Sequence, residues 1–124
     1  MITQLNPDVL PEATGTYTHG TLVTGATRTV FVSGQVPWDE PVPADFDTQC
    51  RIVWRNVLAV LGEAGMGVQH LAKVTVYLSD RRYRAANGRI RQEFLGDHRP
   101  ALTVIIADIY APEWLLEIEA IAMA

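Results

Sequence analysis

The chain has 124 residues, of which 14 are acidic and 10 are basic, so its formal net charge is −4. This length predicts one domain over residues 1–124, because domains commonly contain ~100–150 residues. With 48% hydrophobic and 19% charged residues, the composition excludes a disordered chain. The acidic balance argues against nucleic acid as a partner.

Targeting and cross-linking features are missing from the sequence. The N-terminal stretch 1–14 has neither the basic nor the apolar region of a signal peptide, and no apolar run approaches the ~18 residues of a membrane span. The single cysteine, Cys50, excludes an intrachain disulfide framework and a thiolate-rich metal site. We therefore expect a cytoplasmic protein with no membrane partner.

The first half of the chain predicts two strands and a helix. After an irregular segment at 6–15, β-rich residues at 17–23 and 29–33 flank the turn-like stretch 24–27, which indicates a hairpin. A proline-rich loop at 36–44 follows.

The helix is predicted to begin after Asp45, a suitable N-cap, and to end at Gly62 and Gly65. Between them, apolar residues recur with helical spacing. They are Phe46, Cys50, Val53, Trp54, Val57, Leu58 and Leu61.

The second half predicts a strand, a helix and two more strands. The stretch 71–78 alternates as a strand, and helix 81–95 follows a cap at Ser79 or Asp80. A near-continuous apolar strand at 101–107 and an alternating strand at 115–124 complete the chain.

This order of elements predicts an α+β fold in two layers, with two amphipathic helices on one face of a mixed sheet. The last strand carries Ile121 and Met123 on the face opposite Ile118, so the helix-free face of the sheet is partly apolar. An apolar sheet face usually packs against another subunit, and we therefore expect a homo-oligomer.

Two elements could carry chemistry. Ser33 and Gly34 end a strand, where a hydroxyl and a free backbone N–H can hold a carbonyl or carboxylate oxygen. Glu117 and Glu119 share one face of the last strand beside apolar residues. Such a carboxylate is either structurally paired or a proton-transfer group, and the sequence alone leaves both roles open.

The remaining reactive residue types favour structural roles. The three histidines are scattered, and Cys50 lies on an apolar helix stripe, so neither a metal site nor a cysteine nucleophile is expected. We interpret the arginine-rich stretch as a solvated helix face rather than a nucleic-acid patch. It contains Arg81, Arg82, Arg84, Arg89 and Arg91.

Several stretches, taken together and in order, resemble the RidA/YjgF family of reactive intermediate deaminases, once catalogued as L-PSP endoribonucleases. The stretches are GTYTHG at 15–20, VFVSGQVP at 30–37, Thr48-Gln49, LGEAG at 61–65, VTVYL at 74–78, RPA at 99–101 and EIEAIA at 117–122. The resemblance implies a chorismate-mutase-like fold assembled as a homotrimeric barrel, with clefts between subunits. It also implies cofactor-free hydrolysis of enamines and imines to keto acids and ammonia.

The same resemblance implies roles for individual residues. Glu117 matches the carboxylate that activates water, Ser33 and Gly34 match the oxygen-binding pair, Tyr17 matches a pocket tyrosine, and Asn87 matches an asparagine at the subunit interface. We expect Glu117, Ser33 and Tyr17 to be catalytic, and Gly34 and Asn87 to bind substrate.

The chain departs from the family at Leu102, where deaminating members have an arginine that pairs with the substrate's carboxylate. A lost charge-assisted hydrogen bond costs ~1.5–3 kcal/mol, so ordinary 2-aminoacrylate deamination should be weak. Arg99 is a poor replacement because it precedes the strand. Leu102, its neighbour Thr103, and Trp114, which lies three residues before Glu117, complete the expected substrate contacts.

The sequence leaves two functions open, and whether the protein is an enzyme is therefore undecided. Retention of Glu117, Ser33, Tyr17 and Asn87 favours a hydrolase acting on an imine, an enamine or a related small molecule. Leu102 favours a non-catalytic trimer that binds a small ligand or regulates a partner.

Overall fold

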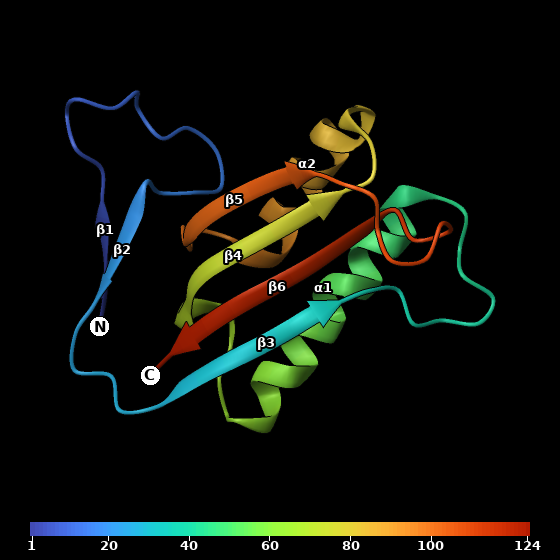
Figure 1. The fold of residues 1–124 in the computed structure, drawn as a ribbon. Coiled ribbons are helices and arrows are strands. Elements are labelled where there is room, and N and C mark those ends of the chain that lie inside the picture. The colour runs from blue at the N-terminus through green and yellow to red at the C-terminus, as the bar shows by residue number, and fades with distance from the viewer.

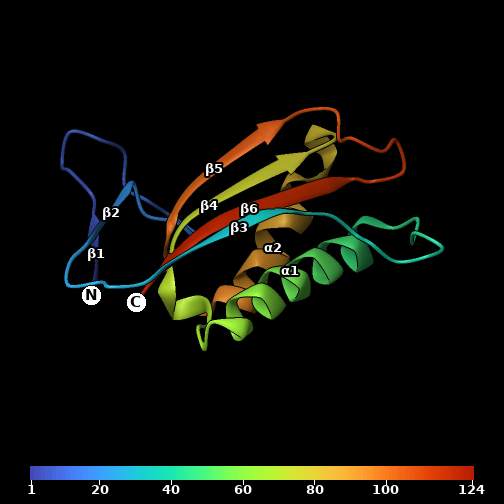
Figure 2. The same cartoon turned by 60° about the horizontal axis from the view of Figure 1, so that its bottom comes forward.

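The structure, a computed structural model, describes residues 1–124 and contains a four-stranded mixed sheet with both helices on one face (Figures 1 and 2). The sheet order is β3-β6-β4-β5, and β6 runs antiparallel to both neighbours while β4 and β5 are parallel. The strands are β3 (Thr29–Gln35), β4 (Leu71–Leu78), β5 (Ala101–Ile106) and β6 (Leu116–Met123). The predicted α+β two-layer architecture is confirmed.

The predicted cap at Asp45 begins the first helix, whereas the predicted cap at Asp80 begins a 3₁₀ turn and the second helix starts only at Arg84, three residues later than expected. The Asp45 carboxylate accepts a hydrogen bond from the backbone N–H of Thr48 at 2.9 Å, and α1 (Phe46–Glu63) follows. The Asp80 carboxylate accepts from the N–H of Arg82, so one 3₁₀ turn, η2 (Arg81–Tyr83), precedes α2 (Arg84–Leu95). A second 3₁₀ turn, η1 (Val68–His70), leads into β4.

The core lies between the sheet and the two helices, as the apolar stripe of α1 predicted. The α1 residues Cys50, Val53, Trp54, Val57 and Leu61 are all fully buried. They pack with alternate residues of β4 and β6 and with Ile90 and Leu95 of α2. The buried sheet residues of this core are Val32, Leu71, Val74, Val76, Leu78, Leu116, Ile118, Ala120 and Ala122.

The predicted hairpin between residues 17–23 and 29–33 is wrong. The strand β2 (Gly20–Val23) pairs instead with β1 (Ile2–Leu5), a segment for which the sequence predicted no element, and this small sheet lies beside the main one (Figure 1). The strand β3 pairs with β6 in the main sheet, where Val32 is buried in the core. The segment between β2 and β3 therefore crosses from one sheet to the other instead of turning back.

The helix-free face of the sheet is mixed in character rather than simply apolar. Phe31 is 75% exposed on it, yet it also carries Lys73, Thr75, Tyr77 and Glu119. No helix combines the length and the apolar character needed to cross a lipid bilayer.

Candidate functional site

A β-bulge places Ser33 and Gly34 on the helix-free face. Val32 pairs with Ala120 and Gln35 with Ile118, so two residues of β3 stand opposite the single residue Glu119. A bulge of this kind kinks the strand and redirects side chains, and bulges are common beside active sites. The predicted strand end at Ser33-Gly34 is therefore an irregularity within β3.

Glu117 lies directly over Gly34. A Cβ atom on Gly34 would be 2.7 Å from the carboxyl carbon of Glu117 and would overlap its Oε2. Only glycine leaves room for the carboxylate at this position. The sequence predicted that Gly34 and Glu117 belong to one site, and the structure places them in contact.

The environment of Glu117 favours its protonated form. Burial raises the pKa of the Glu117 carboxyl above its ordinary value of 4.5, and the negative charge of Glu119 raises that pKa further. Desolvation and a like charge both disfavour a carboxylate, which brings its pKa closer to the range that suits proton transfer near neutral pH.

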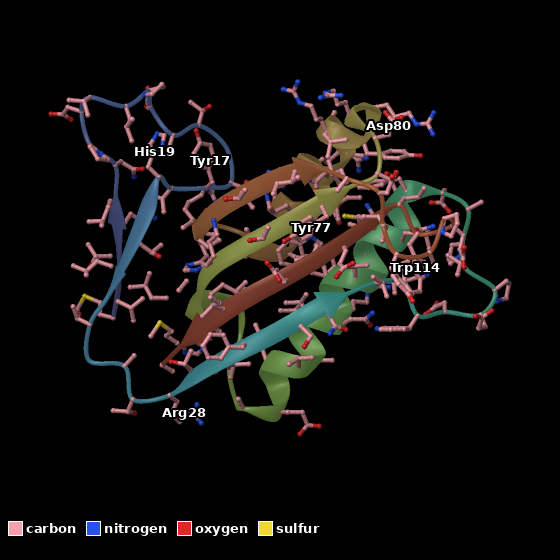
Figure 3. The ribbon with its side chains drawn as sticks, in the orientation of Figure 1. Tyr17, His19, Arg28, Tyr77, Asp80 and Trp114 are labelled. Carbon is pink, nitrogen blue, oxygen red and sulfur yellow. The ribbon has the colours of Figure 1, made fainter.

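A hollow of about 290 Å³ continues from Ser33 across the helix-free face. Its wall includes Lys73, Thr75 and Glu119. The hydroxyl of Tyr77, labelled over the sheet in Figure 3, donates a hydrogen bond to the Glu119 carboxylate at 3.1 Å, and this bond raises the pKa of Tyr77. Glu119 is thus held by a neighbour, whereas no side chain donates a hydrogen bond to Glu117.

A buried glutamine fixes the loops beside the start of β6. The Gln49 side chain donates to the carbonyls of Pro43 and Glu113 at 2.7 and 3.0 Å and accepts from the N–H of Leu115 at 2.8 Å. These bonds hold the loop that carries Trp114, whose ring meets that of Trp38 edge-on at 5.6 Å. Trp114 therefore packs against another tryptophan, two residues before β6 begins.

The other predicted residues lie at the opposite edge of the sheet. Tyr17 stands beside the start of β5, because Thr18 bridges to Ala101, and its ring meets that of His19 edge-on at 5.6 Å (Figure 3). Asn87 is buried on α2, and Leu102 packs on the core from β5.

Thr103 faces away from Leu102, toward the helix-free side. Its hydroxyl accepts a hydrogen bond from the Lys73 ammonium group at 2.6 Å. Thr103 is thus engaged within the sheet surface, and it does not share a face with Leu102.

One protomer does not bring all the predicted residues into one pocket. Ser33, Gly34 and Glu117 lie on β3 and β6, whereas Leu102 lies on β5 at the far edge. The two edge strands are three strand spacings apart, which is ~14 Å at ~4.8 Å per spacing. The side chains of Leu102 and Glu117 also lie on opposite faces of the sheet.

The interpretation of the arginine stretch as fully solvated is wrong at Arg91. This side chain is only 9% exposed, and its Nε donates to the Thr16 hydroxyl at 2.6 Å. The signal was available in the sequence, because Arg91 follows Asn87 by four residues and adjoins the apolar Ile90, so it borders the buried side of α2. Tyr77 was also missed, because its contact with Glu119 depends on strand order.

Other potentially reactive side chains are buried in the core or hydrogen-bonded to the backbone. Burial raises the pKa of the Cys50 thiol to about 12, so this cysteine is not a nucleophile at neutral pH. Arg99 donates to the backbone carbonyls of Gly96 and His98, which leaves it bound to its own loop. No three His, Cys, Asp or Glu residues cluster closely enough to hold a metal ion.

Known proteins resemble this chain over most of its length. The family model described as Endoribonuclease L-PSP matches residues 8–124. A RutC family protein of Pyrococcus abyssi is 36% identical over 97 residues, which cover 75% of this chain and 76% of the relative. TdcF of Escherichia coli, named as a candidate reactive intermediate deaminase, is 31% identical over 91% of this chain and 90% of its own.

Solved structures agree with these relatives. A Yersinia pestis protein of the Rid family, YyfB, covers 99% of this chain and 98% of its own at 25% identity, with a TM-score of 0.85. Serine-bound TdcF covers 98% of both chains at 30% identity, with a TM-score of 0.72. The fold, the matched model and these relatives together show that the chain belongs to the RidA/YjgF family, the family of Endoribonuclease L-PSP.

Proposed function

We propose that this protein is a Rid-like hydrolase that converts small imines or enamines to carbonyl compounds and ammonia. The observation that carries the proposal is the position of Glu117, whose partly buried carboxylate lies over Gly34 with no side-chain donor to neutralise it. The name of TdcF supports the same general activity.

The proposed reaction begins from the protonated imine, which an enamine reaches by taking a proton at its β-carbon. Water attacks the carbon of the C=N bond while Glu117 removes a proton from that water, which gives a neutral carbinolamine. The Ser33 hydroxyl and the Gly34 N–H lie at the bulge, where they would bind an oxygen of the substrate. Glu117 then returns its proton to the amino nitrogen, and the C–N bond breaks as the hydroxyl oxygen forms the C=O bond and passes its own proton back to the Glu117 carboxylate or to solvent. Ammonia leaves, and a carbonyl compound remains.

We further propose that the site is completed between subunits of a homotrimer, in the cytoplasm, without a cofactor. The expected contacts at Tyr17 and Asn87 lie at the opposite edge of the sheet from Ser33 and Gly34. A second copy can bring its β5 edge to the β3–β6 side of the first. Trp114 and Thr103 remain proposed substrate contacts of this assembled site.

Replacing Glu117 with glutamine tests the catalytic role. Glu117→Gln keeps the shape of the side chain but removes the base, so turnover should fall at least ~10²-fold. The substrate is an imine released in situ by an amine or amino-acid oxidase, and the rate is read as ammonia formed above spontaneous hydrolysis. Glu119→Gln, which alters the neighbouring carboxylate held by Tyr77, is the matched control and should cost far less.

A second candidate function is a small-ligand-binding trimer without catalysis. The observation that favours it is Leu102, which packs on the core where deaminating relatives carry an arginine. The serine-bound structure of TdcF supports binding of small ligands in this family. If wild-type protein accelerates no imine hydrolysis yet binds a small ligand, this second function replaces the first.

A further inference from the structure

A second cavity lies between α2 and the edge strand β5. It has a volume of about 410 Å³, which is within the size range of small-molecule sites. Two apolar side chains of β5 form one wall, and polar side chains of η2 and α2 form the other. The lining residues are Arg81, Arg84, Asn87, Arg91, Val104 and Ile106.

Arg91 is a buried cation without a counter-charge. It is 9% exposed, its Nε is bound to the Thr16 hydroxyl, and its Nη1 is buried with no hydrogen-bond partner. No carboxylate lies within salt-bridge distance of it, and burial lowers its pKa below the usual value. Buried charges are normally paired, so a guanidinium left unsatisfied beside a cavity is a site for an anion.

Asn87 supplies a complementary unsatisfied acceptor. This residue is 2% exposed, and its Oδ1 is buried without a partner. Asn87 and Arg91 are four residues apart on one helix, so their side chains are neighbours on the same face of α2. The cavity therefore offers a cationic donor and a neutral acceptor about one helical turn apart.

The mouth of the cavity is positively charged although the protein as a whole is acidic. Arg81 and Arg84 are exposed there, and neither forms an ion pair. By contrast, Arg89 on the same helix is paired with Asp47 at 3.0 Å. No acidic residue lines the cavity, so its electrostatic field attracts anions. Figure 3 shows nitrogen-tipped side chains gathered beside Asp80, where η2 begins.

We propose that this α2–β5 cavity binds a small carboxylate that carries an N–H or O–H group next to it. The carboxylate pairs with the Arg91 guanidinium, the N–H or O–H donates to Asn87 Oδ1, and Val104 with Ile106 limits the size of the apolar remainder. Amino acids, imino acids and hydroxy acids share this chemistry.

This inference deepens the proposed function and rests on it in one respect, because Asn87 is among the substrate contacts proposed above. It places the substrate's carboxylate on α2 instead of at position 102, where Leu102 offers no charge. Ligand binding itself does not require Glu117, which lies on the other face of the sheet. Binding and turnover can therefore be tested separately.

Calorimetric titration with four probes tests the binding chemistry. L-Serine and L-lactate carry both groups, propionate lacks the donor, and ethanolamine lacks the carboxylate. We expect L-serine or L-lactate to bind at least ~10-fold more tightly than propionate or ethanolamine, since a hydrogen bond to a charged group contributes about that factor or more. Comparing the affinity for L-serine with that for L-lactate distinguishes an amino-acid ligand from a hydroxy-acid ligand. If none of the probes binds at about 10 mM, the proposal is wrong.

Variants then assign the binding to Arg91. Arg91→Met keeps an unbranched apolar side chain, removes the unpaired charge and should weaken binding at least ~10-fold. The melting temperature measures separately the cost of losing the hydrogen bond from Arg91 to Thr16. Arg89→Met, on the same helix but outside the cavity, is the matched control and should bind as the wild type does. Unchanged binding by Arg91→Met would overturn the proposal.

Two further measurements keep the outcome clear. If Arg91→Met does not fold, the site can be located from amide chemical shifts of the wild-type protein. Adding serine or lactate should then shift the amide signals of residues 84–91 and 104–106. Shifts confined to other residues would contradict the assignment. Glu117→Gln should retain full ligand binding. Retained binding with absent turnover refutes the hydrolase alone, whereas turnover that is insensitive to Arg91→Met refutes the carboxylate site alone.

Discussion

Substituting Gly34 with alanine perturbs the contact on which the proposed chemistry depends. The added Cβ would lie 2.7 Å from the carboxyl carbon of Glu117 and 3.1 Å from its Cγ. Carbon atoms in contact are ~3.5–4.0 Å apart, so the Glu117 side chain must retreat by ~1 Å. A displacement of that size at a reacting group can reduce the rate by ~10²-fold.

The cost to folding should be smaller than the cost to activity. The atoms that must move belong to the flexible end of one side chain, so the free energy of unfolding should fall by only ~1 kcal/mol, the lower end for overpacking. The displaced carboxylate gains solvent, and its raised pKa should return toward the ordinary value of 4.5. Chemical denaturation and a ¹³C NMR titration of Glu117 measure these two effects, alongside imine hydrolysis.

Gly62→Ala is the matched control for this experiment. Gly62 lies in the last turn of α1, and a Cβ there has no atom within 4 Å. It should leave turnover unchanged and stabilise the helix by up to ~1 kcal/mol. If Gly34→Ala retains wild-type turnover while the NMR titration shows the Glu117 pKa moved, Glu117 is not the catalytic base.

Two further predictions concern Glu117 and Leu102. The pKa of Glu117 is higher in the folded state than in the unfolded state, so the contribution of Glu117 to the free energy of unfolding should fall as pH rises from 4.5 through the raised pKa. Glu117→Gln should lack this fall. Chemical denaturation of both proteins at several pH values measures the difference. A Gln variant that follows the wild-type curve would show that Glu117 is not desolvated. If Arg91 binds the carboxylate of 2-aminoacrylate, wild-type deamination in a coupled assay that generates this intermediate should be measurable, and Arg91→Met should lower it. If only an arginine at position 102 can bind that carboxylate, wild-type deamination should be weak and Leu102→Arg should raise it. No gain favours the binding trimer.

Periodicity and capping residues were sufficient to predict the main layer architecture. The Asp45 cap and the apolar stripe from Phe46 to Leu61 located α1, and the alternation at 71–78 matched β4 residue for residue. These signals depend only on residues close together in the sequence, so they predict an element whichever strands it later pairs with. The pairing of β2 with β1 is not local, and the short polar stretch at 2–5 gave no sign that it would form a strand.

The candidate site, like the fold, could be predicted from the sequence only in part. The resemblance implied site roles for both Gly34 and Glu117, but their contact and the bulge at Ser33 that permits it depend on the register between β3 and β6. Arg91 was misjudged because the other four arginines of the stretch are exposed, and composition concealed the one buried member. Contacts such as Tyr77 with Glu119 require the strand order, which no single strand encodes.

The edge strand β5 argues that the site is completed by another copy of the chain. Val104, Ile105 and Ile106 are 40%, 42% and 37% exposed, and an uncovered apolar edge strand is a site of uncontrolled association unless a partner buries it. This edge is also where Tyr17 lies, far from Ser33 and Gly34. A second copy of the chain bound at β5 would therefore both cover the exposed edge strand and complete the site.

Ile105→Lys tests this link between assembly and function. A lysine on an exposed edge strand opposes strand association, so the variant should sediment as a monomer near 13.7 kDa, whereas we expect the wild type to sediment as a trimer. Val9→Lys, at a residue that is 91% exposed outside the main sheet, should remain a trimer. Imine hydrolysis should disappear together with the trimer, because one protomer holds only half of the proposed contacts. A monomeric variant with full turnover would show that Ser33, Gly34 and Glu117 need nothing from a neighbouring subunit.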